Sequence, residues 1–142
     1  MTSQCHLTIK NELPELRQLQ SRLEDFFQGQ QLCMQLAAEM MLISEELLAN
    51  TISYGYCDDR QHTIEITMAI EDGKFSMTLI DDAQAFNPLL QQPPSMGRTN
   101  EEAAIGGLGI PLVLALSDQQ EYCYHNGRNM FIFSKSLLLA EH

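Results

Sequence analysis

The chain has few positive charges, and this scarcity excludes one large class of function. Its 142 residues include only eight lysines and arginines against 19 acidic residues, which gives a net charge of −11. Nucleic acid binding is therefore not expected, because phosphate backbones are held mainly by Lys and Arg. An acidic surface suits a protein that meets basic surfaces, or one that is simply soluble.

The sequence also lacks paired cysteines, a leader segment and a long apolar run. No two of its four cysteines form a CxxC pair, so free thiols in a reducing cytosol are expected rather than a zinc site. The first ten residues have no apolar signal-peptide core, and no apolar run approaches the roughly 20 residues that cross a bilayer. We therefore expect a cytoplasmic protein with no membrane association.

The chain contains no repeats or low-complexity tracts, and its length and 44% apolar content predict one folded domain over 1–142. The expected elements are a strand over 5–12, helices over 12–28 and 31–54, a hairpin over 62–82, a loop over 82–104, a helix after the glycines of 106–109, and a hairpin over 119–135. Strands joined by hairpins give a mostly antiparallel sheet, with the helices on one face. The expected fold class is α+β, a two-layer α/β sandwich.

Glu46 and Asn50 form the first polar cluster. They are four residues apart on a largely apolar helix and therefore lie on one helical face. Such a pair can hold a hydrated Mg²⁺ through hard oxygen ligands, and the Glu can act as a base. The alternative is the polar edge of a half-exposed helix.

Asp81 is the second candidate. Phe75, Met77 and Leu79 point to one face of a strand, and Asp81 is the next residue in that series. An inward carboxylate costs free energy unless a polar group satisfies it. Either Asp81 accepts a hydrogen bond from a ligand amino group, or it starts a turn and caps its own backbone.

The third candidate is the glycine-rich turn over 106–109. Backbone N–H groups at a helix start favour phosphate, although a flexible hinge of the preceding loop explains the glycines equally well. An amino-group acceptor, a magnesium ligand and a phosphate-binding turn are together the parts that a purine nucleotide requires. The loop between Asp81 and the glycine-rich turn is long enough to be a lid.

These motifs resemble those of a known family. "SEELLANTISYGY" is similar to the N-box Glu-x-x-x-Asn-x-x-x-His/Tyr-Gly-Tyr, and "DDAQAFNP" is similar to the first glycine box, Asp-x-Gly-x-x-Phe-Asp/Asn-Pro. "GGLGIPLVLALSDQQEYCYHNGRNMFIFSK" looks like the second glycine box and the closing hairpin. Over about residues 40–135 the chain resembles the anti-sigma-factor serine/threonine kinases of bacterial partner switching, which belong to the histidine kinase-like (GHKL) ATPase superfamily.

The resemblance implies a role for each matching residue. Glu46 would be the catalytic base for a serine or threonine hydroxyl, Asn50 would coordinate Mg²⁺ on the ATP phosphates, and Asp81 would accept from the adenine amino group. Gly107 and Gly109 would let a lid over about 84–106 close. The nucleotide-binding set is Asn50, Asp81, Ala83, Phe86, Gly107, Leu108 and Gly109. The implied partners are a STAS-type anti-sigma antagonist and a sigma factor, and such proteins often form homodimers.

Three positions depart from the family pattern. Ala83 stands where Gly is usual, so a positive φ there would cost on the order of 1 kcal/mol, and its methyl group would crowd the adenine. Tyr54 replaces the His of the N-box, a common variation. Ala103 stands where the lid usually carries Arg, with Arg98 as a more distant substitute, and loss of that charge would slow phosphoryl transfer.

Two functions and one weaker alternative therefore remain. The first is a kinase that phosphorylates an antagonist and sequesters a sigma factor. The second, favoured by Ala83 and Ala103, is a catalytically weak or inactive switch that acts on a sigma factor or another target by binding alone. The ATP-binding half of a sensor histidine kinase is less expected, since no helix with a phosphorylatable His precedes the motifs.

Overall fold

A computed structural model describes residues 3–30, 32–90 and 109–137. Its strands are β1 (Ser3–Lys10), β2 (Thr63–Glu71), β3 (Lys74–Asp81), β4 (Gln119–His125) and β5 (Arg128–Ser136). Its helices are α1 (Leu16–Gly29), α2 (Met34–Tyr54) and α4 (Ile110–Leu114), with 3₁₀ turns η1 (Leu13–Glu15) and η2 (Pro88–Leu90).

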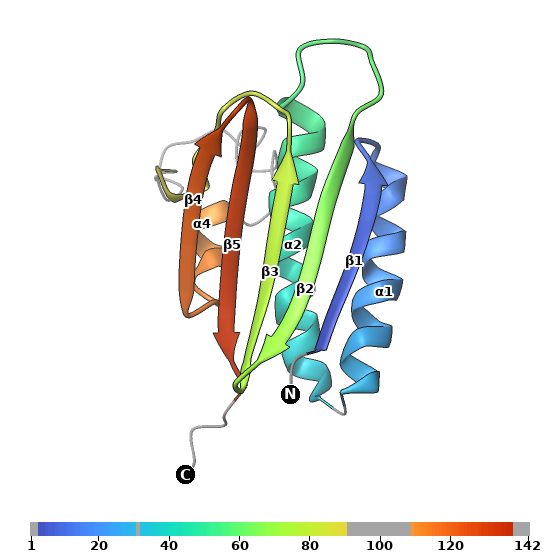
Figure 1. Cartoon of the computed structure of the whole chain (residues 1–142), viewed down its shortest axis with the longest axis vertical. Coiled ribbons are helices and arrows are strands. Elements are labelled where there is room, and N and C mark those ends of the chain that lie inside the picture. The colour runs from blue at the N-terminus through green and yellow to red at the C-terminus, as the bar shows by residue number, and fades with distance from the viewer. Residues whose placement is uncertain (1–2, 31, 91–108, 138–142) are drawn as a thin grey trace.

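The strands form one sheet in the order β1-β2-β3-β5-β4, as Figure 1 shows, and every neighbouring pair is antiparallel. Two hairpins have turns with positive φ at both central residues, Asp72-Gly73 (54° and 72°) and Asn126-Gly127 (53° and 76°). Two residues with positive φ form a turn whose twist matches that of the flanking strands. These turns confirm both hairpins that the sequence predicts.

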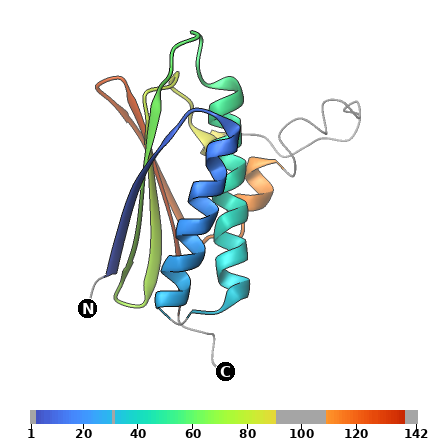
Figure 2. The same ribbon diagram turned by 90° about the vertical axis from the view of Figure 1, so that its right-hand side faces the viewer.

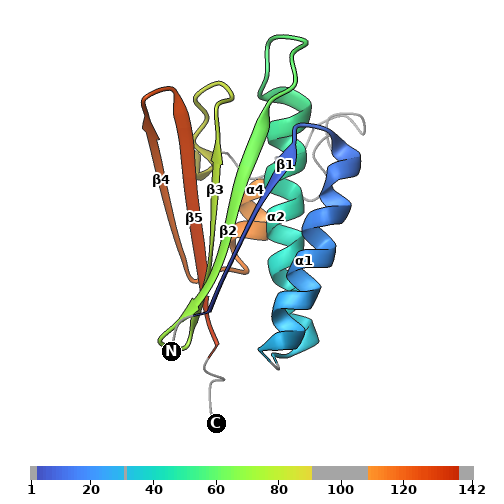
Figure 3. The ribbon, with the colours of Figure 1, turned by 45° about the vertical axis from the view of Figure 1, so that its right-hand side comes forward.

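Helices α1, α2 and α4 cover one face of the sheet, so that the described part of the chain has two layers (Figures 2 and 3). This arrangement confirms the predicted α+β sandwich, and the sheet is antiparallel throughout the described strands. No helix within the described residues is long and apolar enough to cross a membrane.

The core lies between the two layers and follows from the alternation of the strands. On β3, Phe75, Met77 and Leu79 are buried, while the residues between them are partly exposed. Phe27 of α1 packs on Phe75 with ring centroids 5.1 Å apart. Burying each such side chain contributes roughly 1.5–3 kcal/mol. The same alternation carries Asp81, at the end of β3, to the inner face.

The helix after the glycines is shorter than expected. The apolar run through 110–118 predicts a longer helix, but α4 has only five residues and ends at Leu114. The Ser117 hydroxyl and the Gln120 side-chain amide both donate to the Leu114 carbonyl, at 2.7 and 3.2 Å. This carbonyl therefore has partners outside a continuing helix, which is a physical reason for the early end.

Candidate functional site

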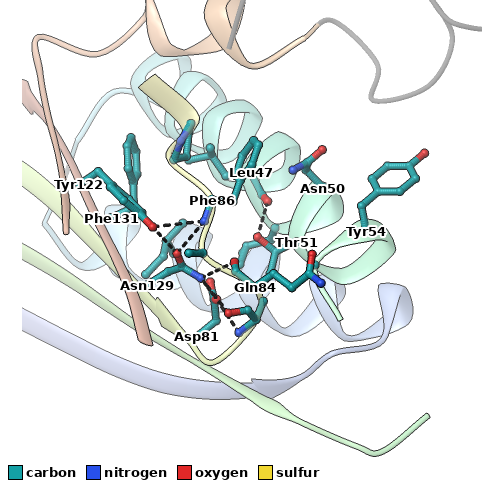
Figure 4. A pocket seen from close by; sticks show the side chains of 16 residues that line it. Leu47, Asn50, Thr51, Tyr54, Asp81, Gln84, Phe86, Tyr122, Asn129 and Phe131 are labelled. Atoms are coloured by element: carbon teal, nitrogen blue, oxygen red, sulfur yellow. Dashed lines mark hydrogen bonds between the residues drawn. The ribbon is translucent and has the colours of Figure 1, made fainter. Parts of the chain in front are cut away.

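A pocket of about 220 Å³ lies between α2 and the ends of β3 and β5. Four residues of the predicted nucleotide-binding set line it, namely Asn50, Asp81, Ala83 and Phe86. They come from α2, from the end of β3 and from the segment that follows β3. Figure 4 shows Asn50 on the α2 side of the pocket, apart from a hydrogen-bonded group around Asp81.

Asp81 lies at the inner end of this pocket with its carboxyl group mostly buried. Its Oδ1 accepts two hydrogen bonds, from the Asn129 side-chain amide at 2.9 Å and from the Ala83 N–H at 3.0 Å. Burial raises the pKa of Asp81, these two hydrogen bonds act in the opposite direction, and the nearby charge of Asp82 adds to the rise. Asp81 therefore caps its own turn, as one sequence interpretation expects, and it also lines a pocket. Its bond to a ligand amino group stays a prediction.

Asn129 is the residue that the sequence interpretation missed. It lies on β5 directly opposite Asp81 in the strand register and is only 6% exposed. Its Nδ2 also donates to the carbonyls of Ala83 at 3.2 Å and Gln84 at 3.0 Å, while its Oδ1 accepts from the Phe86 N–H at 3.1 Å. The buried side-chain amide of Asn129 thus connects β5 to the predicted first glycine box through hydrogen bonds.

Tyr122 of β4 completes this network. Its hydroxyl donates to Asn129 Oδ1 at 2.5 Å and accepts from the Phe86 N–H at 3.2 Å (Figure 4). Burial raises the pKa of Tyr122, and the charge of Asp81 acts in the same direction. The backbone of Phe86 is therefore held from both β4 and β5.

Ala83 does not carry the strain that a positive φ would impose. Among the described residues, the non-glycine positions with positive φ are Asp72 and Asn126. Ala83 is 5% exposed, and the next residue, Gln84, donates its N–H to the Gly55 carbonyl at 2.9 Å. The first glycine box therefore packs against the C-terminal end of α2 without left-handed backbone at this position.

Glu46 lies on a different surface from the pocket. It lines a neighbouring groove with Leu16 and Leu42, whereas Asn50 and Tyr54 line both the groove and the pocket. The pocket and the groove thus meet at Asn50 and Tyr54, and Asn50 is one helical turn from Glu46. The structure brings Asn50 and Asp81 to one cavity and leaves Glu46 beside it.

The predicted second glycine box is described only in part. Gly109 precedes α4 with φ 90°, a conformation that L side chains rarely adopt, and it is not among the residues that line the pocket. Gly107, Leu108, Arg98 and Ala103 lie outside the described residues, as does most of the expected lid over 84–106.

A second polar group lies at the same end of the sheet as the pocket. The ring nitrogens of His62 lie 2.8 Å from an oxygen of Asp58 and 3.1 Å from both oxygens of Asp82, and these carboxylates accept from its N–H groups. The His62 ring also stacks on Tyr56. These contacts raise the pKa of His62, first through Asp58 and then through Asp82. The Tyr56 hydroxyl is buried and has no hydrogen-bond partner among the described residues.

The described residues contain no group of three or more His, Cys, Asp or Glu side chains that could hold a metal ion. The amide oxygen of Asn50 is a hard ligand of the type that Mg²⁺ accepts, but one such group is not a complete site. The donor set therefore fits a magnesium ion that brings its other ligands with it, as waters and phosphate oxygens.

Comparison with known proteins agrees with the fold. The family model of the histidine kinase-like ATPase domain matches residues 9–135 of the chain. Among solved structures, the crystal structure of the RsbU and RsbW domains of Rv1364c from Mycobacterium tuberculosis matches with a TM-score of 0.67 at 14% identity. That match covers 94% of this chain and 32% of the other, so this chain spans about a third of its length. Curated proteins gave no match.

Proposed function

This chain belongs to the histidine kinase-like ATPase family, and we propose that it binds a magnesium–adenine nucleotide in the pocket between α2, β3 and β5. The observation that carries the proposal is Asp81, a largely buried carboxylate in a pocket whose other lining residues are apolar or uncharged. Its described hydrogen bonds both fall on Oδ1. Oδ2 is the atom that we assign to the amino group of adenine.

The phosphate end of the nucleotide belongs at Asn50. This residue stands on α2 at the border of the pocket, and its amide oxygen would join the phosphates in holding Mg²⁺. The bound magnesium would neutralise phosphate charge. The chain itself would orient the nucleotide through two points, a base at Asp81 and phosphates at Asn50.

We further propose that the chain is a protein serine/threonine kinase. Glu46 lies one helical turn from Asn50 in the adjoining groove, where a hydroxyl of a second protein could approach the phosphates. Glu46 would accept the proton of that hydroxyl as its oxygen attacks the γ-phosphorus and ADP leaves. Phosphoryl transfer depends chiefly on positioning and charge stabilisation, which a base beside the Mg²⁺ ligand would serve.

The proposed substrate is a STAS-type antagonist, and the proposed client is a sigma factor held inactive. The motifs support this assignment, and the structural match supports the fold on which it depends. The three motifs resemble those of anti-sigma kinases, and the matching solved structure contains an RsbW domain. Because that match has 14% identity, it supports the fold, and the assignment of partners depends on the motifs.

A second candidate is a switch that binds nucleotide and partner without transferring phosphate. Its specific support is the position of Glu46, which lines the neighbouring groove and not the nucleotide pocket, together with Ala103 in place of a lid arginine. This candidate predicts ATP affinity without turnover, and partner binding that is insensitive to Glu46→Gln.

Calorimetry of the full chain with Mg-ATP tests the binding proposal. Asp81→Asn should weaken ATP binding by roughly 10- to 150-fold, the equivalent of one hydrogen bond to a charged group. Asp82→Asn is the matched control, because Asp82 is exposed and bonds His62 away from the pocket. Wild-type protein without ATP affinity, or an Asp81→Asn variant with full affinity, would refute the proposal.

Incubation with Mg-ATP and a STAS-type protein tests the kinase proposal. We expect phosphoserine or phosphothreonine in the partner, and its loss in Glu46→Gln with unchanged ATP affinity. If a partner that demonstrably binds the chain stays unphosphorylated, the switch is the better description and the kinase claim is wrong.

A further inference from the structure

Asn129 has an unusual position for a polar side chain. It belongs to the last described strand, is 6% exposed, and faces inward beside Phe131 and Phe133 in the alternation of β5. A buried amide costs free energy unless its donors and acceptor are used. The hydrogen bonds that it makes should therefore explain why Asn occupies this position.

The amide of Asn129 has no capacity left for a ligand. Its oxygen has two lone pairs, and the Phe86 N–H and the Tyr122 hydroxyl both donate to it. Its two N–H hydrogens already face the Asp81 carboxylate and two backbone carbonyls. Asn129 can therefore affect a bound base only through the groups it holds, above all Asp81.

The protonation state of Asp81 decides which base it can accept. An ionised carboxylate only accepts hydrogen bonds, whereas a protonated one also donates. A 6-amino purine presents a donor at this position and a 6-oxo purine presents an acceptor. Ionised Asp81 therefore favours adenine, and protonated Asp81 would tolerate the 6-oxo base.

Some groups around Asp81 favour its neutral form, and the hydrogen-bond donors favour its ionised form. The titratable groups that face it are Asp82 from the end of β3, Tyr56 from the segment after α2, and Tyr122 from β4. Burial raises the pKa of Asp81, and Asp82 adds to the rise. The opposing contributions come from the Asn129 amide, first, and from the Ala83 N–H.

We propose that Asn129 is a positioning residue that sets purine specificity: by donating to Oδ1 it keeps Asp81 an acceptor and directs Oδ2 to the base. This inference depends on the proposed binding of an adenine nucleotide. It adds that the choice between 6-amino and 6-oxo purines is made by a residue that does not touch the base.

The test measures the affinities of Mg-ATP and Mg-ITP by calorimetry at pH 6 and pH 8. ITP carries the 6-oxo base without the extra amino group of guanine. Wild-type protein should prefer ATP at both pH values. Asn129→Leu should reduce the preference at least tenfold at pH 6 and by less at pH 8, because loss of the amide donor raises the pKa of Asp81 and so favours its protonated form at the lower pH.

Two further variants separate this role from a merely structural one. Tyr122→Phe removes a hydroxyl from the same network but leaves the Asn129–Asp81 hydrogen bond, so its ATP-to-ITP ratio should equal that of the wild type at both pH values. Asn129→Thr restores a hydroxyl donor and should recover part of the preference at pH 6. Asn129→Ala, which also removes the donor but adds no bulk, serves in place of Asn129→Leu if that variant does not fold.

The inference is wrong if Asn129→Leu keeps the wild-type ratio. It is also wrong if the affinities for ATP and ITP fall by the same factor at both pH values. That result would mean that Asn129 supports the structure of the pocket without controlling the protonation of Asp81. If the wild-type chain binds neither nucleotide, the proposed function itself is refuted. If it binds ATP and only the predicted change in preference is missing, this inference alone fails.

Discussion

Gly55 is the position at which a single added carbon should perturb the site most directly. It follows α2, donates its N–H to the Thr51 carbonyl at 2.8 Å, and accepts from the Gln84 N–H at 2.9 Å. A Cβ on Gly55 would lie 2.6 Å from the Thr51 oxygen and 2.9 Å from the Cβ of Ala83. Both distances are below the contacts that real Cβ atoms make, so the end of α2 or the first glycine box must shift.

The expected cost of Gly55→Ala follows from these two contacts. Forcing extra carbon into a packed site costs about 1–3 kcal/mol in the free energy of unfolding. For a domain of this size each kcal/mol lowers Tm by about 3–4 °C, so a fall of roughly 3–12 °C is expected. The affinity for Mg-ATP should also fall, because Gln84 is bonded to Gly55 and lies in the pocket wall.

A double-mutant cycle with Ala83→Gly tests the assigned cause. Removing the Ala83 methyl eliminates one of the two close contacts of Gly55→Ala and leaves the other, with the Thr51 oxygen. Urea unfolding should therefore show a favourable coupling of about 0.5–2 kcal/mol between the two substitutions. An unaltered stability for Gly55→Ala, or strictly additive effects, would refute the packing described here.

Three further outcomes are expected. Hydrogen bonds to Asp58, and then to Asp82, raise the pKa of His62. The stabilisation of the fold by these bonds is therefore present below the ordinary pKa of 6.5 and is lost as the pH rises through the raised value. Urea unfolding from pH 5.5 to pH 9 should show this loss in the wild type and not in His62→Gln. Gly127 and Gly29 both have open space for a Cβ, but Gly127 has a positive φ of 76°. Thermal melts should therefore show Gly127→Ala destabilised by about 1–2 kcal/mol through backbone strain, and Gly29→Ala unchanged or slightly stabilised. Chelation of magnesium should weaken ATP binding but leave adenosine binding unaltered, and an equal loss for both ligands would contradict the proposed metal position.

The sequence predicts the architecture because its signals are local. Asp72-Gly73 and Asn126-Gly127 fix two hairpins through positive φ, and period-two alternation fixes which side chains face the helices. Asp81 is found as a candidate by this alternation alone. The sequence predicts the helix after the glycines but not the early end of α4, because that end depends on side chains of Ser117 and Gln120 that donate to one carbonyl.

The sequence predicts only some of the residues that line the pocket. Asn129 and Tyr122 stand in a hairpin with no motif to single them out, and their importance comes from the register that places β5 beside β3. Apart from alternation, which puts Asn129 on the inner face with Phe131, no local signal separates it from other strand residues. The separation of Glu46 from the pocket is likewise a matter of tertiary packing, since helical spacing predicts only that it shares a face with Asn50.

The pairing of Asp81 with Asn129 joins residues that are 48 positions apart in the chain. During synthesis, therefore, β1 to β3 and the two long helices can assemble before the opposite wall of the cavity has left the ribosome. Non-local strand pairing of this kind carries a larger loop-closure cost than a hairpin and tends to come late. A ligand of this cavity can stabilise only chains that have already inserted β5, so its binding would report the insertion of that strand.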